Sequence, residues 1–168
     1  VCNALDTILI HEKQLNNLLP KIVSELNKNG VQTRLDSKLF QSIKNATSIK
    51  LIKKANDKDW GKEFLDLIVS IKSVKSVDDA INHIDEYSFG HTDGIISNIN
   101  KNINTFVQRV NSSAVTVNAS TRFNDGGEIG LGSEIAISTT KVSPRGPLGL
   151  EEITTYKWLI IGKGHTRG

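Results

Sequence analysis

The chain has 168 residues, a formal net charge of +3 and 38% hydrophobic residues. This composition excludes a disordered or collagen-like chain and is typical of one globular domain, which buries roughly 70% of its unfolded surface. A single Cys excludes a disulfide framework and a multi-thiolate zinc site, and no metal site is predicted. No apolar run approaches the ~18 residues of a membrane span, so we expect a cytoplasmic protein without membrane contact. Met is absent, and we therefore expect a fragment or a processed product.

The weak positive charge does not indicate a nucleic-acid partner. The lysines from Lys50 to Lys58 are interrupted by Asp57 and followed by Asp59, and no aromatic ladder accompanies them. Nucleic-acid binding usually combines a basic groove with aromatic side chains on which bases stack. We interpret these lysines as a solvent-facing surface and expect no nucleic acid as partner.

The chain begins with a strand pattern and continues with a helix pattern. Thr7–His11 alternates as a half-buried strand does. Apolar residues at helical spacing run from Leu15 to Leu26, and Gly30 fits a left-handed C-terminal cap. Pro20 removes a hydrogen bond inside this stretch, which predicts a kink or the start of a second helix.

The same alternation continues along the chain. Leu65–Lys72 is apolar on both faces, as a buried parallel strand is. Ser76 and Asp79 predict a capping box for a helix that ends at Gly90. Shorter elements are predicted as helices at Ser37–Asn45 and Ile103–Val110 and as strands at Ile49–Ile52, Gly94–Ser97 and Ala114–Asn118.

Strands that alternate with helices predict an α/β fold, with a mainly parallel twisted sheet flanked by helices. We expect a catalytic domain over residues 1–143 and a C-terminal arm over residues 144–168 for oligomerisation or inter-domain contact. Within the arm, Glu152–Gly162 is β-prone and predicts an extended strand without a partner strand nearby in sequence. Such a strand often pairs with another subunit, so a homo-oligomer is expected.

Cys2 is the one thiol of the chain. Its ordinary interpretation is a small buried hydrophobe. The residues around it are also compatible with one helical turn, whose N-terminal amides and dipole would favour the nucleophilic thiolate. Cys2 is therefore a candidate nucleophile, and a backbone amide near Asn3 is a candidate oxyanion donor. A Cys-dependent acyl hydrolase that uses one of the 4 histidines and a non-catalytic assembly fragment both stay open as alternatives.

A second polar cluster follows the strand predicted at Ala114–Asn118. It contains Ser120, Thr121 and Arg122, at the carboxyl end of a parallel strand, where α/β proteins bind ligands. An arginine there is suited to clamp a carboxylate or a phosphate, although a surface salt bridge is an equally good interpretation. The nearby glycines Gly130 and Gly132 lack the third glycine and the preceding strand of a dinucleotide-binding fingerprint.

Several segments match one known pattern in a fixed order: Val1–His11, Asp59–Trp60, Glu63–Leu67, Gly90–Thr92, Asn118–Phe123, Ser133–Thr139 and Arg145–Glu151. Together they resemble the γ-glutamyl phosphate reductases of the aldehyde dehydrogenase superfamily. The resemblance implies an aldehyde dehydrogenase-like catalytic domain. It also implies the NADPH-dependent reduction of L-glutamyl 5-phosphate to L-glutamate 5-semialdehyde and phosphate in proline biosynthesis.

The resemblance also implies roles for single residues. The family's nucleophile falls on Cys2, and the glutamate that holds the nicotinamide ribose falls on Glu63. The loop around the distal end of the substrate falls on Ser120–Glu134, with Arg122 as our candidate for the α-carboxylate. Enzymes of this family carry a dinucleotide-binding domain before the cysteine. We therefore expect NADPH to be bound mostly by a domain absent from this chain, and the isolated chain to be inactive.

Overall fold

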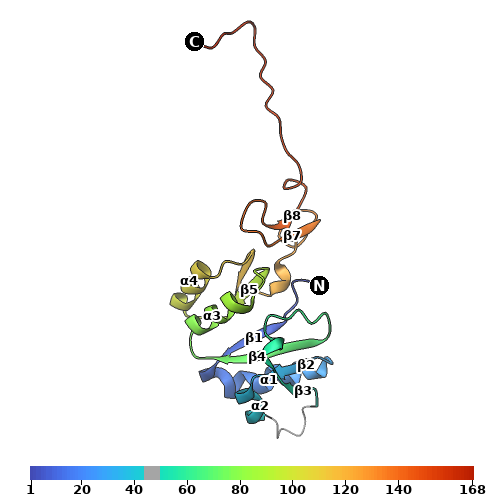
Figure 1. The fold of residues 1–168 in the computed structure, drawn as a ribbon, viewed down its shortest axis with the longest axis vertical. Coiled ribbons are helices and arrows are strands. Elements are labelled where there is room, and N and C mark those ends of the chain that lie inside the picture. Colours follow the sequence, from blue (N-terminus) through green and yellow to red (C-terminus); the bar gives the residue numbers. More distant parts are fainter. Residues whose placement is uncertain (44–49) are drawn as a thin grey trace.

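A computed structural model describes residues 1–43 and 50–168. Its strands and helices alternate through the first two thirds of the chain (Figure 1). In chain order they are β1 (Thr7–His11), η1 (Glu12–Gln14), α1 (Leu15–Lys28), β2 (Gln32–Leu35), α2 (Ser37–Ile43), β3 (Ile52–Lys54), η2 (Asp57–Asp59), β4 (Ile68–Val74), α3 (Val77–Tyr87), β5 (Thr92–Ile95), α4 (Asn100–Arg109), β6 (Ala114–Val117), η3 (Thr121–Phe123), β7 (Ala136–Ser138) and β8 (Gly146–Leu148).

The main sheet has four parallel strands in the order β1-β4-β2-β3. Its central strand β4 is buried at Val69, Ser70 and Ile71, which explains why both faces of this segment lack charge. Helices α1 and α2 contribute Leu19 and Leu39 to the core formed with the strands. The predicted α/β fold with a parallel sheet flanked by helices is confirmed.

A smaller unit is built from the next part of the chain. Strands β5 and β6 form a separate two-stranded parallel sheet, and α3 and α4 pack around Ile81, Phe106 and Val110. Ile95 and Val115 of the two strands pack against this cluster. No helix in the described ranges is long and apolar enough to cross a membrane.

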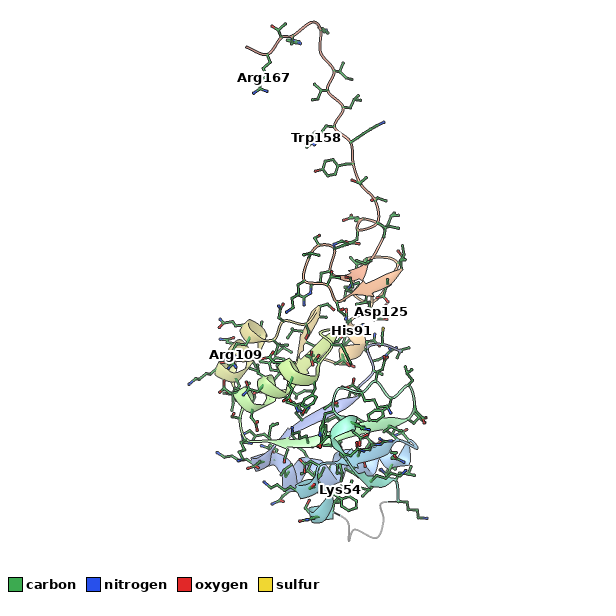
Figure 2. The ribbon with its side chains drawn as sticks, viewed as in Figure 1. Lys54, His91, Arg109, Asp125, Trp158 and Arg167 are labelled. Atoms are coloured by element: carbon green, nitrogen blue, oxygen red, sulfur yellow. The ribbon has the colours of Figure 1, made fainter. Side chains whose placement is uncertain are left out.

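The C-terminal part begins with a hairpin and ends in an extended tail. Strands β7 and β8 pair antiparallel, so the hairpin joins residues on both sides of position 143. The expected strand over residues 152–162 is not formed in the part of the chain that the structure describes, because no neighbouring strand supplies hydrogen bonds. The tail projects from the rest of the molecule (Figures 1 and 2). Within it, Trp158 is 83% exposed and Ile160 is 90% exposed.

Two elements of the first half differ from the sequence-based expectation. Strand β4 begins at Ile68 instead of Leu65, because Leu65 has a left-handed backbone with φ 54° that no strand accepts. Helix α1 continues through Pro20, so no second helix begins there. Leu19 and Val23 are buried on either side of this proline, and their packing outweighs the one lost hydrogen bond.

Other expectations are met more closely. Gly30 has φ 75°, as a left-handed cap of α1 requires. The Ser76 hydroxyl accepts a hydrogen bond from the Asp79 amide at 3.1 Å, whereas the Asp79 carboxylate accepts from the Lys75 amide at 2.9 Å. The helix expected over 37–45 is described as far as Ile43, and position 49 of the strand expected over 49–52 also lies outside the described residues.

Candidate active site

Cys2 lies in a tight turn at the entrance to β1. The turn is closed by a hydrogen bond from the Ala4 amide to the Val1 carbonyl at 3.2 Å, and the Cys2 side chain is exposed. No helix begins in this part of the described chain, so the segment forms a single turn without the helix N-terminus and dipole that were expected at Cys2. The carbonyl of Asp6 accepts from the Ser70 amide of β4 at 2.8 Å, so the chain already pairs with the main sheet at the end of this turn.

Asn3, the residue after Cys2, fastens this turn to a segment that follows β6. Its side chain is 4% exposed, and its Nδ2 donates to the Asn124 carbonyl at 3.0 Å and to the Arg122 carbonyl at 3.4 Å. The Thr121 hydroxyl donates to the Asn3 carbonyl at 2.8 Å, and the Arg122 guanidinium donates to Asn3 Oδ1. Residues about 120 positions apart are therefore held together by several hydrogen bonds.

The segment around Arg122 that accepts the hydrogen bonds of Asn3 is itself fixed at the carboxyl ends of β5 and β6. Asn118, directly after β6, has φ 52° and exchanges two hydrogen bonds of 2.9 Å with the backbone of Ser97, which follows β5. The Ser120 hydroxyl then accepts from the Arg122 amide at 3.2 Å and caps η3. A polar cluster thus lies at the end of two parallel strands, where the sequence predicted it.

Three residues that were not singled out as site residues complete this network. Asn124 is buried, and its Nδ2 donates to the Thr92 hydroxyl at 2.7 Å. The same hydroxyl lies 2.6 Å from Nδ1 of His91. His91 and Asp125 lie near the junction between the body and the β7–β8 hairpin (Figure 2). The match of Gly90–Thr92 to the family pattern is the sequence signal that points to this network, whereas the burial of Asn124 is visible only in the structure.

Negative charge gathers beside the Cys2 turn. Burial raises the pKa of the Asp6 carboxyl above its ordinary value, and the charges of Asp93 and Glu63 raise it further, whereas a hydrogen bond from Thr7 opposes them. Glu63 itself lies exposed in the loop between η2 and β4, outside the hydrogen-bonded network of Asn3.

The structure therefore brings together Cys2, Asn3, Ser120, Thr121 and Arg122, all candidate site residues. It assigns the side chain of Asn3 an anchoring role. The guanidinium of Arg122 makes one bond to Asn3 and keeps other N–H groups for a ligand. Within the described ranges, no three His, Cys, Asp or Glu side chains are grouped so that they could hold a metal ion.

The glycine-rich loop is folded on itself. The Gly126 amide donates to the Glu134 carboxylate at 2.8 Å, and a Cβ on Gly126 would lie 2.5 Å from the Ser133 carbonyl. The loop leads to β7 and not to a helix, so it lacks the helix N-terminus that cradles a pyrophosphate. Among the residues considered for cofactor binding, only Glu63 is suited to it, because its exposed carboxylate can accept hydrogen bonds from ribose hydroxyl groups.

No family model matches the chain. It is 48% identical over 168 residues to the gamma-glutamyl phosphate reductase of Dehalococcoides mccartyi and 50% identical over 167 residues to that of Clostridium beijerinckii. These matches cover 100% and 99% of the chain, which spans 39% of the length of each of these curated relatives.

Solved structures show similarity to the same family of enzymes. The gamma-glutamyl phosphate reductase of Thermotoga maritima superposes with a TM-score of 0.89 at 45% identity, over 100% of this chain and 39% of that one. The yeast enzyme of the same name, from Saccharomyces cerevisiae, gives 0.57 at 28% identity, over 76% and 32%. A propionaldehyde dehydrogenase from Clostridium phytofermentans, 20% identical, shares the fold with a TM-score of 0.56 over 88% and 40%.

Proposed function

We propose that this chain, a homologue of the gamma-glutamyl phosphate reductases along its whole length, supplies the nucleophile and part of the substrate site of such an enzyme. The proposed reaction is the NADPH-dependent reduction of L-glutamyl 5-phosphate to L-glutamate 5-semialdehyde with release of phosphate. It is a cytoplasmic step of proline biosynthesis. The proposal is carried by one observation: hydrogen bonds join the exposed Cys2 turn to the polar segment around Arg122.

The chemistry begins at the sulfur of Cys2. Its thiolate attacks the acyl carbon of the substrate, so that a C–S bond forms while the C–O bond to phosphate breaks and phosphate leaves with the electron pair. A backbone N–H near Asn3 donates to the acyl oxygen as negative charge develops there. When bound, NADPH supplies the hydride that reduces the thioester. The C–S bond then breaks, which releases the aldehyde and returns the thiolate to Cys2.

The substrate's α-carboxylate is the proposed ligand of Arg122. Arg122 is exposed, and its fork of N–H groups matches a carboxylate. The hydroxyl groups of Ser120 and Thr121 supply neutral hydrogen bonds next to it. Since the Arg122 guanidinium also contacts Asn3, a carboxylate bound there would lie close to the Cys2 turn.

Most of the cofactor site is proposed to lie in the part of the enzyme that this chain does not span. Glu63 contributes the contact to the nicotinamide ribose. One such contact is worth roughly 0.5–3 kcal/mol, against the ~8 kcal/mol of a micromolar complex. Calorimetric titration of the purified 168-residue chain with NADPH should therefore show no micromolar binding. A micromolar dissociation constant would refute this division of the cofactor site.

The tail supports a proposal about assembly. Its apolar side chains lie exposed on an extended segment, which is suited to pair with another subunit or domain. We assign residues 144–168 this role and the preceding residues the catalytic role, in a homo-oligomeric enzyme.

A chimera tests the proposed function. This chain replaces the matching segment of the Clostridium beijerinckii relative, and the reverse reaction is followed as NADPH formed from L-glutamate 5-semialdehyde, phosphate and NADP. We expect activity with Cys2 and none with Cys2→Ser, because a hydroxyl is far less ionised near neutral pH. Circular dichroism controls for folding of the variant. Turnover by Cys2→Ser would refute the role of Cys2, and phosphate release from the acyl phosphate without any use of NADPH would favour an acyl hydrolase instead.

A further inference from the structure

The loop that carries Glu63 has no secondary structure of its own. It connects η2 to β4, and Glu63 is exposed within it. Leu65 follows with a left-handed backbone, φ 54°, and its side chain is 86% exposed. Since no strand or helix fixes this loop, the side-chain contacts that hold it decide where the Glu63 carboxylate lies.

Arg34 of β2 contacts the residue just before the loop and a residue in the middle of the loop. Its guanidinium NH1 forms an ion pair with Asp59, the last residue of η2, just before the loop. Cζ of the same guanidinium lies over the Phe64 ring, 4.8 Å from its centre, and Phe64 directly follows Glu63. Because Arg34 pairs with Ser70 in the register of β2 and β4, its backbone is fixed in the middle of the main sheet.

Asp59 is a rigid partner for this arginine. It is 2% exposed, and its second carboxylate oxygen accepts from the backbone amide and the side-chain amide of Asn56, each at 2.9 Å. A Cβ on Gly61 would lie 2.6 Å from the Tyr87 carbonyl of α3, so the backbone of the loop also touches that helix. The loop thus has contacts with both β2 and α3.

We propose that Arg34 is a positioning residue that sets the place of the Glu63 carboxylate through Asp59 and Phe64. The inference rests on the proposed role of Glu63 in holding the cofactor. Arginine is required because its planar group offers an N–H edge to the carboxylate and a flat face to the ring at the same time. A lysine retains the charge but cannot offer both.

The first experiment follows the loop in the 168-residue chain by limited proteolysis with trypsin, measured as the rate of cleavage after the exposed Lys62. We expect Arg34→Lys to accelerate this cleavage about tenfold or more, because proteolysis follows the local opening of a segment. Arg109→Lys is the matched control, because Arg109 forms an exposed ion pair with Asp78 that joins α4 to α3. Unchanged cleavage after Lys62 in Arg34→Lys would overturn the inference.

The second experiment measures kinetics in the chimera. We expect Arg34→Lys to raise KM for NADP about three- to tenfold, with KM for L-glutamate 5-semialdehyde unchanged. Phe64→Leu, which leaves the ion pair intact, should act in the same direction and serves if Arg34→Lys fails to fold. Adding Arg34→Lys to Glu63→Gln should cause no further rise, because Arg34 acts through Glu63.

The outcomes separate the inference from the function on which it rests. If Glu63→Gln leaves KM for NADP unchanged, the role of Glu63 is refuted and the inference falls with it. If Glu63→Gln raises KM but Arg34→Lys and Phe64→Leu do not, only the role of Arg34 is refuted. An equal rise in KM for both substrates would show that Arg34 is merely structural, and would also overturn the inference.

Discussion

Acid should destabilise this protein through one buried histidine. His83 of α3 is 7% exposed, with its ring centre 5.6 Å from that of Trp60 and 4.6 Å from that of Tyr87. Nζ of Lys72 lies 3.1 Å from His83 Nδ1, which suits a neutral imidazole that accepts from the ammonium group. Burial, and to a smaller degree the charge of Lys72, lower the pKa of His83 from 6.5 to about 4, while two acidic residues oppose this shift.

The sign and size of the effect follow from linkage. Because the folded-state pKa lies below the unfolded one, the unfolded chain binds the proton first as pH falls, and stability is lost between about pH 6.5 and about pH 4. At about 1.4 kcal/mol for each pH unit of difference, the whole loss is about 3 kcal/mol. Above pH 6.5 this contribution is fully present, and below pH 4 no more of it is lost.

Urea unfolding, monitored by fluorescence, measures this loss. Trp60 reports on the His83 site once Trp158 of the tail is replaced by Phe in every variant. His83→Gln keeps an acceptor for Lys72 but does not titrate, so its free energy of unfolding should fall about 2–3 kcal/mol less than that of the parent between about pH 7.5 and about pH 4.5. His165→Gln, in the exposed tail, should behave like the parent. Equal losses in the parent and in His83→Gln would refute the reasoning.

Four further changes test the packing, the backbone conformation and the Asn3 anchor. Gly90→Ala should lower the free energy of unfolding in urea by about 1–2 kcal/mol, because the φ of Gly90, 72°, is left-handed but a Cβ there meets open space. Gly61→Ala should lower it clearly more, because φ is 68° and the added Cβ would lie 2.6 Å from the Tyr87 carbonyl. Leu35→Ala, at a fully buried core position, should lower the free energy of unfolding by about 2–5 kcal/mol in the same urea assay. A loss below about 1 kcal/mol would contradict the assignment of Leu35 to the core. Asn3→Ala leaves buried carbonyl groups unpaired and should cost about 1–3 kcal/mol by thermal unfolding, whereas a neutral effect would show that this anchor is dispensable.

The strands and helices of the first half were largely predictable from local patterns. Alternation identified β1, and the stripe from Leu15 identified α1, because both elements bury one face. Hydrophobicity alone misplaced the start of β4. Leu65 is as apolar as the strand residues after it, but its backbone is left-handed and its side chain is 86% exposed, so its hydrophobicity does not reflect a buried strand position.

The site was predictable as a set of residues but not as an arrangement. Cys2 and Arg122 stood out because thiols and arginines next to strand ends are chemically informative. The bond between Arg122 and Asn3 was not predictable, since it joins residues 119 positions apart through the packing of two separate sheets. The helix N-terminus expected at Cys2 is not formed for a related reason: residues 1–4 close a single turn, and the Asp6 carbonyl after it already accepts from the Ser70 amide of β4.

The exposed tail also bears on the colloidal behaviour of the chain. Residues 158–162 form an uncharged, proline-free, β-prone run, the composition of segments that aggregate as stacked strands. Lys157 and Lys163 flank the run on both sides and act as gatekeepers, since their charges repel a second copy of the same run. Salt screens that repulsion, because the Debye length shrinks to about 3 Å at 1 M. A solution of this chain kept at low ionic strength should therefore stay clear at concentrations at which a high-salt solution becomes turbid.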